Sequence, residues 1–317
     1  MKIVVFGAAH RVGLLVNGRI VDLAAAESTL PADLAGFIAA DRRALDLAEG
    51  LGALADDPEH PAVVLEASTV LHAPVVSRPR IACAAGNIPA HTAGSARRKG
   101  VEASNALAGL ADGRGGVPSE ADIRSATRER AEPRGFWKDF AIAKGPGDTI
   151  AIPARAEQFD YEGEVAVVIA RAALDVPSGR GATYFWGVTL LNDWSIRGAS
   201  RKDSHSFNLG KNFDGGASVG PCIVVGELDP ADMHVTTTVN GELRQSYGTS
   251  DMIFSHAEYL EYLSRDFTFL PGDLIAGGSG PGTATDSGAG FLRPGDMVEV
   301  TSAEVGTLSN EMVAKGL

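Results

Sequence analysis

Cysteine, positive charge and long apolar runs are all scarce in this sequence. Its two cysteines, Cys83 and Cys222, lie in no CxxC or zinc-type spacing, which argues against a disulfide framework. The 28 Lys and Arg residues face 40 Asp and Glu, and a net charge of −12 repels phosphate backbones. No apolar stretch approaches the roughly 20 residues of a membrane span, and the start shows no signal-peptide pattern. We therefore expect a cytoplasmic protein with no nucleic-acid and no membrane partner.

The chain is large enough for one big domain or two unequal ones, with 317 residues of which 44% are hydrophobic. Near its start, the apolar runs Val12–Val16 and Arg19–Leu23 flank Asn17-Gly18, a strong hairpin signal. The preceding run with Gly7 and Gly13 superficially resembles a dinucleotide-binding turn. That motif needs GxGxxG opening a helix, whereas a hairpin follows here, so we set this interpretation aside.

The domain organisation follows from where the sequence changes character. Residues 24–60 are rich in Ala and Leu and predict one or two amphipathic helices, which place a small N-terminal domain at 1–77. Residues 78–317 are then predicted to form a second, mostly β domain with a few helices, which makes the fold class α+β. Within it, 94–135 is charged and punctuated by glycine, and is either a solvated surface insertion or a mobile lid.

Three acidic residues are the most informative feature of the chain. Glu162 and Glu164 stand two apart at the mouth of an apolar strand, so both point to the same face. Two carboxylates so placed repel one another unless something positive lies between them. Asp193 ends a second apolar strand, beside a polar loop. Three carboxylates without Cys or His predict a site for a hard divalent ion, Mg²⁺ or Mn²⁺, with positions left for substrate.

Other candidate motifs are weaker. Lys211, between glycine-containing turns, could neutralise charge, donate to a substrate oxygen or simply face solvent. The seven histidines form no HExxH motif, so a zinc hydrolase is not predicted. The string 216–220 matches GxSxG, but a Pro and a strand follow it rather than the helix that a nucleophile elbow needs. The Gly-rich run 277–282 could cradle an anion, although no helix clearly follows it.

Taken in order, seven strings resemble the fumarylacetoacetate hydrolase family over roughly residues 78–312. They are GNIPAH (86–91), YEGE (161–164), LNDWSIR (191–197), LGKNFD (209–214), VNGE (239–242), FLPGDLI (269–275) with the Gly-rich loop after it, and LRPGDMVEV (292–300). The resemblance implies the mixed β-sheet roll of that family's C-terminal domain, a homodimer, and Mg²⁺ or Mn²⁺ held by Glu162, Glu164 and Asp193.

The resemblance also implies roles for other residues. His91 would be the general base for water, Lys211 would lie beside the substrate enolate, and the substrate-binding residues would be Asn87, Arg197 and Ser279. A 2-oxo acid can chelate the ion, water deprotonated by His91 would attack the distal carbonyl, and the cation and Lys211 would stabilise the enolate.

This sequence departs from the family pattern at several positions. Many members carry Glu three residues after the His as its partner, and here that position is Gly94. Asp286, in the long loop after Ser279, is a possible substitute. A fourth metal-binding acid of the larger members aligns with Ala84, and the usual Tyr before the His is Ile88. These departures affect the water-activating groups more than the metal site.

The sequence therefore predicts a metal-dependent hydrolase that cleaves a C–C bond in an acylpyruvate or similar 1,3-dicarbonyl 2-oxo acid. An oxaloacetate-type decarboxylase, a hydratase or an isomerase on the same fold is the first alternative, because these reactions need the metal and Lys211 but no hydrolytic dyad. A non-catalytic ligand-binding protein that kept the fold is the second.

Overall fold

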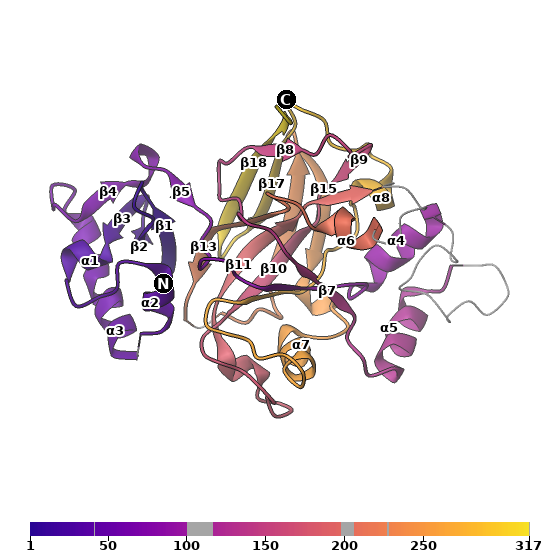
Figure 1. Cartoon of the computed structure of the whole chain (residues 1–317), viewed down its shortest axis with the longest axis horizontal. Helices are drawn as coiled ribbons and strands as arrows, with labels where there is room; N and C mark the ends of the chain where they lie inside the picture. The colour runs from indigo at the N-terminus through magenta and orange to yellow at the C-terminus, as the bar shows by residue number, and fades with distance from the viewer. Residues whose placement is uncertain (41, 100–116, 198–205, 227, 317) are drawn as a thin grey trace.

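The computed structural model describes residues 1–40, 42–99, 117–197, 206–226 and 228–316. These residues fold as a mixture of helices and mixed sheets, as the α+β prediction expects (Figure 1). The strands are β1 (Lys2–Phe6), β2 (Arg11–Val16), β3 (Arg19–Asp22), β4 (Val63–Leu65), β5 (Leu71–His72), β6 (Ile81–Ala84), β7 (Gly135–Lys138), β8 (Ile150–Ile152), β9 (Gln158–Asp160), β10 (Gly163–Ile169), β11 (Phe185–Asp193), β12 (Ser195–Arg197), β13 (Ala217–Val224), β14 (His234–Val239), β15 (Glu242–Gly248), β16 (Leu274–Ala276), β17 (Met297–Ser302) and β18 (Gly306–Ala314). The helices are α1 (Leu23–Ala26), α2 (Leu34–Ile38), α3 (Arg42–Gly50), α4 (Pro89–Lys99), α5 (Glu120–Glu129), α6 (Ser206–Lys211), α7 (His256–Leu263) and α8 (Ala284–Ser287).

The N-terminal part forms the predicted hairpin and then continues into the main sheet. Asn17 and Gly18 both have positive φ, 49° and 74°, which is the backbone of a tight two-residue hairpin turn. β1 then pairs with β13, far along the chain, so one 11-stranded sheet runs through both predicted domains in the order β4-β3-β2-β1-β13-β11-β10-β16-β6-β7 with β5 beside β1. Because strands from 1–77 and from 78–317 share this sheet, the sheet marks no boundary at residue 77, and the division into two domains there stays a prediction.

A second sheet packs across the centre of the first. Its order is β15-β14-β17-β18-β8, and β14, β17 and β18 contact β10, β11 and β13 of the large sheet. Between the sheets lie aliphatic side chains such as Val165, Val188 and Val300, all at most 3% exposed. Apart from the polar residues near the carboxyl end of β11 and the start of β10, these two strands do not alternate apolar and polar residues, because both of their faces are covered.

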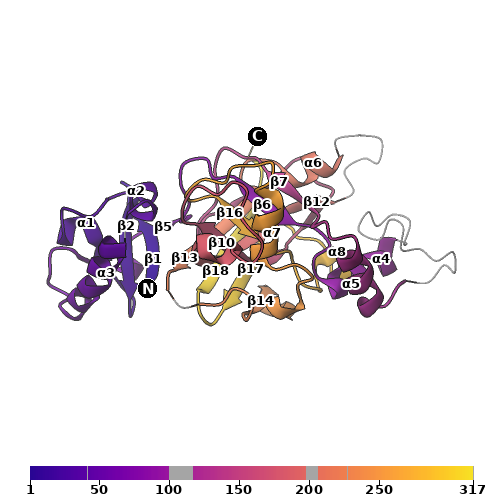
Figure 2. The same ribbon diagram turned by 90° about the horizontal axis from the view of Figure 1, so that it is seen from below.

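Helices α4, α5 and α8 lie together at the end of the molecule away from the N-terminal part (Figures 1 and 2). α5 begins with a capping box made by Ser119 and Asp122, and Arg124 donates to the carbonyls of Asp251 and Met252. The described end of the 94–135 segment is thus a helix anchored to the loop before α7. Residues 100–116 lie outside the described residues, so the choice between insertion and lid stays open.

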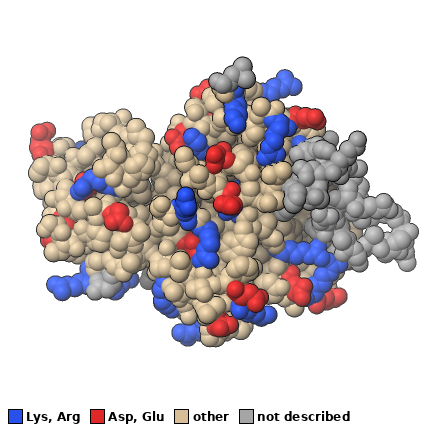
Figure 3. Space-filling view, in the orientation of Figure 1, with Lys and Arg blue, Asp and Glu red and all other residues tan. Residues whose placement is uncertain are grey.

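No described helix is long and apolar enough to cross a bilayer. On the face shown in Figure 3, acidic and basic side chains are interspersed rather than gathered in a stripe.

Candidate active site

The register of two central strands brings the three predicted acids together. β10 and β11 pair antiparallel with Gly163 opposite Asn192, so Glu162 and Asp193 are neighbours, and the Asp193 N–H donates to the Glu162 carbonyl over 2.9 Å. Glu164 lies two residues along on the same face of β10. The strand periodicity and the position of Asp193 at a strand end therefore predicted this meeting point correctly.

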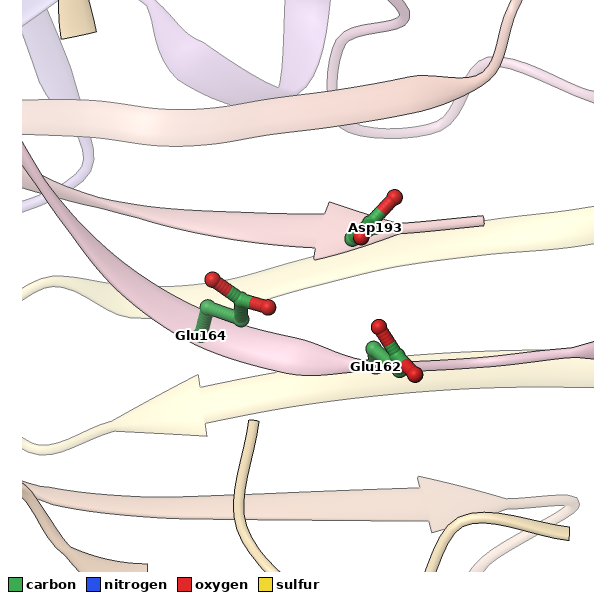
Figure 4. A group of neighbouring side chains, drawn as sticks. All are labelled: Glu162, Glu164 and Asp193. Carbon is green, nitrogen blue, oxygen red and sulfur yellow. The ribbon is translucent and has the colours of Figure 1, made fainter. Parts of the chain in front are cut away.

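Carboxylate oxygens of Glu162, Glu164 and Asp193 all lie within 4.8 Å of one another, and the three side chains point toward a common space (Figure 4). All three residues are at most 6% exposed. A buried all-oxygen donor set fits a hard divalent cation such as Mg²⁺ or Mn²⁺ better than a soft one. The residues present thus fit the ion that the sequence predicted.

The two glutamates are perturbed in opposite directions. Burial alone would raise the pKa of Glu162, but Arg197 and Lys211 beside it hold that pKa well below its usual range. Burial raises the pKa of Glu164 well above its usual range, and the charges of Asp193 and Glu162 raise it further. Among the described residues, Glu164 accepts one hydrogen bond, from the Gly278 N–H at 2.9 Å. A cation at this point would remove the repulsion that Glu164 experiences.

Two buried lysines compensate the negative charge. Lys211 ends α6 and its Nζ donates to Glu162, to Asp193 Oδ2 at 2.6 Å and to Ser195 Oγ at 2.7 Å. Lys138, on β7, donates to the other oxygen of Asp193 and its side chain is fully buried. Of the roles open to Lys211, the structure shows charge neutralisation.

His91 has an acidic partner that is distant in sequence. It lies in the first turn of α4, and its Nδ1 is 2.7 Å from Asp286 Oδ2. Burial lowers the pKa of His91, but the Asp286 carboxylate outweighs burial, and the net pKa is raised. An ionised Asp286 keeps the proton on Nδ1, which leaves Nε2 as the nitrogen that can accept a proton.

Gly94 explains why this pairing is possible. It lies one helical turn after His91, and a Cβ built on it would stand 3.1 Å from the Asp286 Cβ. The missing side chain at Gly94 leaves room for Asp286, which lies in α8, a short helix and not a loop as expected. The structure thus brings Asp286 into hydrogen-bond contact with His91, and its role as the acid in place of Glu stays a prediction.

Arg197 and Asp160 link the triad to α8. Arg197 Nε donates to Asp160 Oδ2 over 3.0 Å, and a terminal nitrogen of Arg197 donates to Glu162. Asp160 is fully buried and also accepts from the N–H groups of Ala284 and Thr285, at the start of α8. These bonds occupy the Arg197 guanidinium within the protein, and its substrate-binding role stays a prediction.

The other two predicted substrate-binding residues hold loops in place. Both amide hydrogens of Asn87 donate to carbonyls, those of Phe254 at 2.9 Å and Gly277 at 2.8 Å, so they are not free for a ligand. Ser279 Oγ accepts from Gln245 Nε2 at 2.8 Å. Gln245 also accepts from the Gly163 N–H and so ties the Gly-rich loop to β10. Substrate binding by Asn87 or Ser279 stays a prediction.

Neither Lys138 nor Asp160 was predicted as a site residue, although Asp160 directly precedes the YEGE string at 161–164. A lysine within the apolar stretch Gly135–Lys138 was the one available signal, because a buried lysine needs an acidic partner. The GxSxG match is confirmed as chance, since Ser218 lies inside β13 and accepts from Trp194 Nε1 at 2.8 Å.

Comparison with known proteins supports the resemblance. The family model "Fumarylacetoacetate (FAA) hydrolase C-terminal" matches residues 83–313. Oxaloacetate tautomerase YisK of Bacillus subtilis is 37% identical over 204 residues, which is 61% of this chain and 64% of that protein.

Two solved structures are also similar. A 5-carboxymethyl-2-hydroxymuconate delta-isomerase from Mycobacterium smegmatis is 32% identical, with a TM-score of 0.62 over 80% of this chain and 86% of that one. Maleylpyruvate hydrolase from Sphingobium sp. SYK-6, in complex with Mn²⁺ and pyruvate, covers 100% of both chains with a TM-score of 0.71, and at 22% identity it shows the fold alone. From the family match and the ordered motifs together, the chain belongs to the fumarylacetoacetate hydrolase family.

Proposed function

We propose that this protein is a divalent-metal-dependent hydrolase that cleaves a C–C bond in an acylpyruvate or a similar 1,3-dicarbonyl 2-oxo acid. The observation that carries the proposal is the 2.7 Å contact between His91 Nδ1 and Asp286 Oδ2, close to three buried carboxylates suited to one cation. Because position 94 is a glycine, His91 has no acidic partner one turn along its own helix. The contact with Asp286 supports a water-activating pair in which the acid comes from α8.

The metal site would orient the substrate. A bound Mg²⁺ or Mn²⁺ would supply Lewis acidity toward the carboxylate and keto oxygens of a 2-oxo acid. Glu162, Glu164 and Asp193 would hold the ion. Lys138, whose side chain is fully buried and pairs with the Asp193 carboxylate, would keep that carboxylate in place. Lys211 provides a further positive charge beside developing negative charge on the substrate.

His91 would carry the proton. Its Nε2 takes a proton from water, the water oxygen bonds to the distal carbonyl carbon, and the C–C bond then breaks. The electron pair goes to the carbon of the pyruvate fragment, which takes the proton back from His91. Asp286 stabilises the imidazolium between these steps, which is the role of an acid paired to a general base.

A second candidate function is isomerisation or tautomerisation of a 2-oxo acid. Two relatives above 30% identity carry such names, YisK as an oxaloacetate tautomerase and the M. smegmatis protein as a delta-isomerase. A His91 that accepts and returns a proton can serve that reaction without any attack by water. Decarboxylation of oxaloacetate needs the same metal site and is distinguished by its product.

Product analysis separates these candidates. The protein with Mn²⁺ is given an acylpyruvate and, separately, oxaloacetate, while pyruvate, the released carboxylic acid, CO₂ and the enol content are followed. The proposal expects pyruvate and a carboxylic acid in equal amounts from the acylpyruvate. Turnover of oxaloacetate alone, as CO₂ release or as enol–keto interconversion, would overturn the hydrolase proposal in favour of the second candidate.

Two variants control for contaminating activity. Glu164→Ala removes a metal ligand and is expected to abolish turnover, whereas Glu258→Ala removes an acid of the exposed Arg128 ion pair and is expected to leave turnover unchanged. Absence of turnover with every substrate in the wild-type protein would favour a non-catalytic ligand-binding role.

A further inference from the structure

We propose that Asp160 is a positioning residue that fixes α8, and with it Asp286, relative to the carboxylate triad. Within the described residues, its side chain makes no hydrogen bond to His91 or to a predicted metal ligand. It acts through its neighbours on either side. The inference rests on the proposed function only in taking the His91–Asp286 pair as the proton-carrying group.

α8 depends on contacts from outside itself. It has four residues, too few to be stable as a helix alone. Asp160 Oδ1 accepts from the Ala284 N–H at 2.8 Å, and Oδ2 accepts from the Thr285 hydroxyl at 2.7 Å and the Thr285 N–H at 3.2 Å. Asp160 therefore binds the donors at the start of α8, one residue before Asp286.

The opposite side of Asp160 leads to the metal site. Arg197 donates from Nε to Asp160 and from a terminal nitrogen to Glu162, so the guanidinium bridges the two carboxylates. A continuous series of hydrogen bonds thus runs from Glu162 through Arg197 and Asp160 to α8, and from Asp286 to His91. This series sets the separation of the predicted base and the predicted metal.

The carboxylate form of Asp160 is needed for this connection. In the described part of the chain, every group that hydrogen-bonds to its side chain is a donor: three backbone N–H groups, one hydroxyl and the Arg197 guanidinium. An asparagine would place its NH₂ group against donors in either orientation, because only one of its two terminal atoms accepts. Asp160→Asn should therefore loosen either α8 or Arg197 while changing little in volume.

Asp273 provides a matched control. It is 4% exposed, it pairs with Arg80, and it accepts from the N–H groups of Arg80 and Leu270 at 3.0 and 2.7 Å. Like Asp160 it is a buried acid that pairs with an arginine and holds a turn of backbone, but within the described residues no hydrogen bond or ion pair joins its side chain to His91 or to the triad. Asp273→Asn should thus report the cost of losing such an acid without any effect on the site.

The test follows the ionisation of His91 by NMR in the full chain, with His91 signals assigned from a His91→Gln variant. Asp286→Asn should lower the pKa of His91 by on the order of one unit or more, because an opposite charge is lost. Asp160→Asn should lower it by a smaller amount, Asp273→Asn should leave it unchanged, and the double variant Asp160→Asn/Asp286→Asn should match Asp286→Asn alone. The charges of Glu162 and Arg197 also act on His91, and Asp273→Asn leaves both of these charges as they are in the wild type.

Activity gives an independent readout. Asp160→Asn should lower kcat by about 10- to 100-fold, as expected when a reacting group is displaced by roughly 1 Å, and should cost little more when Asp286→Asn is already present. A wild-type protein without turnover would refute the proposed function, while the His91 titration still decides the role of Asp160. If Asp160→Asn does not fold, Thr285→Val removes a single donor to Asp160 and should shift the His91 pKa in the same direction. A His91 pKa that is unchanged in these variants, or changed equally by Asp273→Asn, would overturn the inference.

Discussion

At the scale of single residues, the central pair is a histidine and an aspartate that lie 195 positions apart and 2.7 Å distant. The pKa of His91 is raised because the Asp286 charge outweighs burial. A base must be neutral to accept a proton, so activity should be lost as the pH falls through this raised pKa.

Asp286→Asn tests the pairing through the pH dependence of the rate. Without the carboxylate the imidazolium is less stable, so the pKa of His91 falls and the acid limb of kcat/KM against pH should move to lower pH. The plateau should also fall, by about 10²- to 10⁴-fold, the usual contribution of general base catalysis. An acid limb that stays in place would show that another group controls it, and Glu258→Gln, at an exposed ion pair, is the control.

The sequence predicted some of these residues and not others, for a physical reason. Glu162, Glu164 and Asp193 follow from strand periodicity and from the end of an apolar strand, which are local properties. Lys138 and Asp160 gain their roles only from partners in other elements, and no local pattern marks those partners. Asp286 was reached through the gap that Gly94 leaves in the family pattern, not through any spacing.

At the scale of elements, His91 lies on α4 and its acidic partner Asp286 comes from a second helix, α8. His91 and Gly94 stand one turn apart on α4, and Asp286 of α8 fills the space that a side chain at position 94 would occupy. The acid is thus expected to be transferable from one helix to the other.

An exchange variant tests this. Gly94→Glu alone should lower activity because the new side chain meets Asp286, and Asp286→Ala alone should lower it because His91 loses its partner. The double variant Gly94→Glu/Asp286→Ala should recover activity above that of either single variant and raise the pKa of His91 again. Gly94→Ala in the wild-type background measures the effect of the Cβ alone. A double variant no better than the worse single variant would contradict the account.

The strands show what turn signals can and cannot predict. Pro-Gly-Asp turns at 271–273 and 294–296 lie immediately before β16 and β17, so each turn marks in the sequence where a strand begins. Other strands carry no such signal: β7, β8, β9 and β12 have only three or four residues each, too few to show periodicity, and they are held by their pairing partners. The long β18 carries no clear signal either, because Ser309, Asn310 and Glu311 interrupt its apolar residues.

At the scale of the whole molecule, the N-terminal residues 1–77 share a core with the rest of the chain. Ile3 and Val5 of β1 belong to the same buried cluster as Leu191 and Ile223, and Phe37 of α2 packs edge-on against Trp186 of β11 at 6.0 Å between ring centroids. The prediction of a separate small domain at 1–77 came from composition, which does not reveal that β1 pairs with β13.

Removal of residues 1–77 should therefore expose the edge of β13 and an apolar face, and the remainder is expected to be insoluble or to unfold at much lower temperature. A milder version compares Ile3→Ser, fully buried, with Leu65→Ser, 55% exposed. The first should cost roughly 2–5 kcal/mol of unfolding free energy and the second very little, as measured by denaturant unfolding. A soluble truncated chain that keeps full metal binding would show two independent domains.

The most direct measurement of the central claim is a calorimetric titration of the metal-depleted protein with Mn²⁺, in the wild type and in Glu164→Gln. The account predicts one ion per chain in the wild type and an affinity at least about 10- to 100-fold lower in the variant, since even residues behind a metal's ligands change affinity by that factor. It also predicts that Glu164→Gln does not destabilise the metal-free protein, because burial and the charges of Asp193 and Glu162 raise the pKa of Glu164 and so disfavour its ionised form there. Equal Mn²⁺ binding by the two proteins, or none by the wild type, would contradict it.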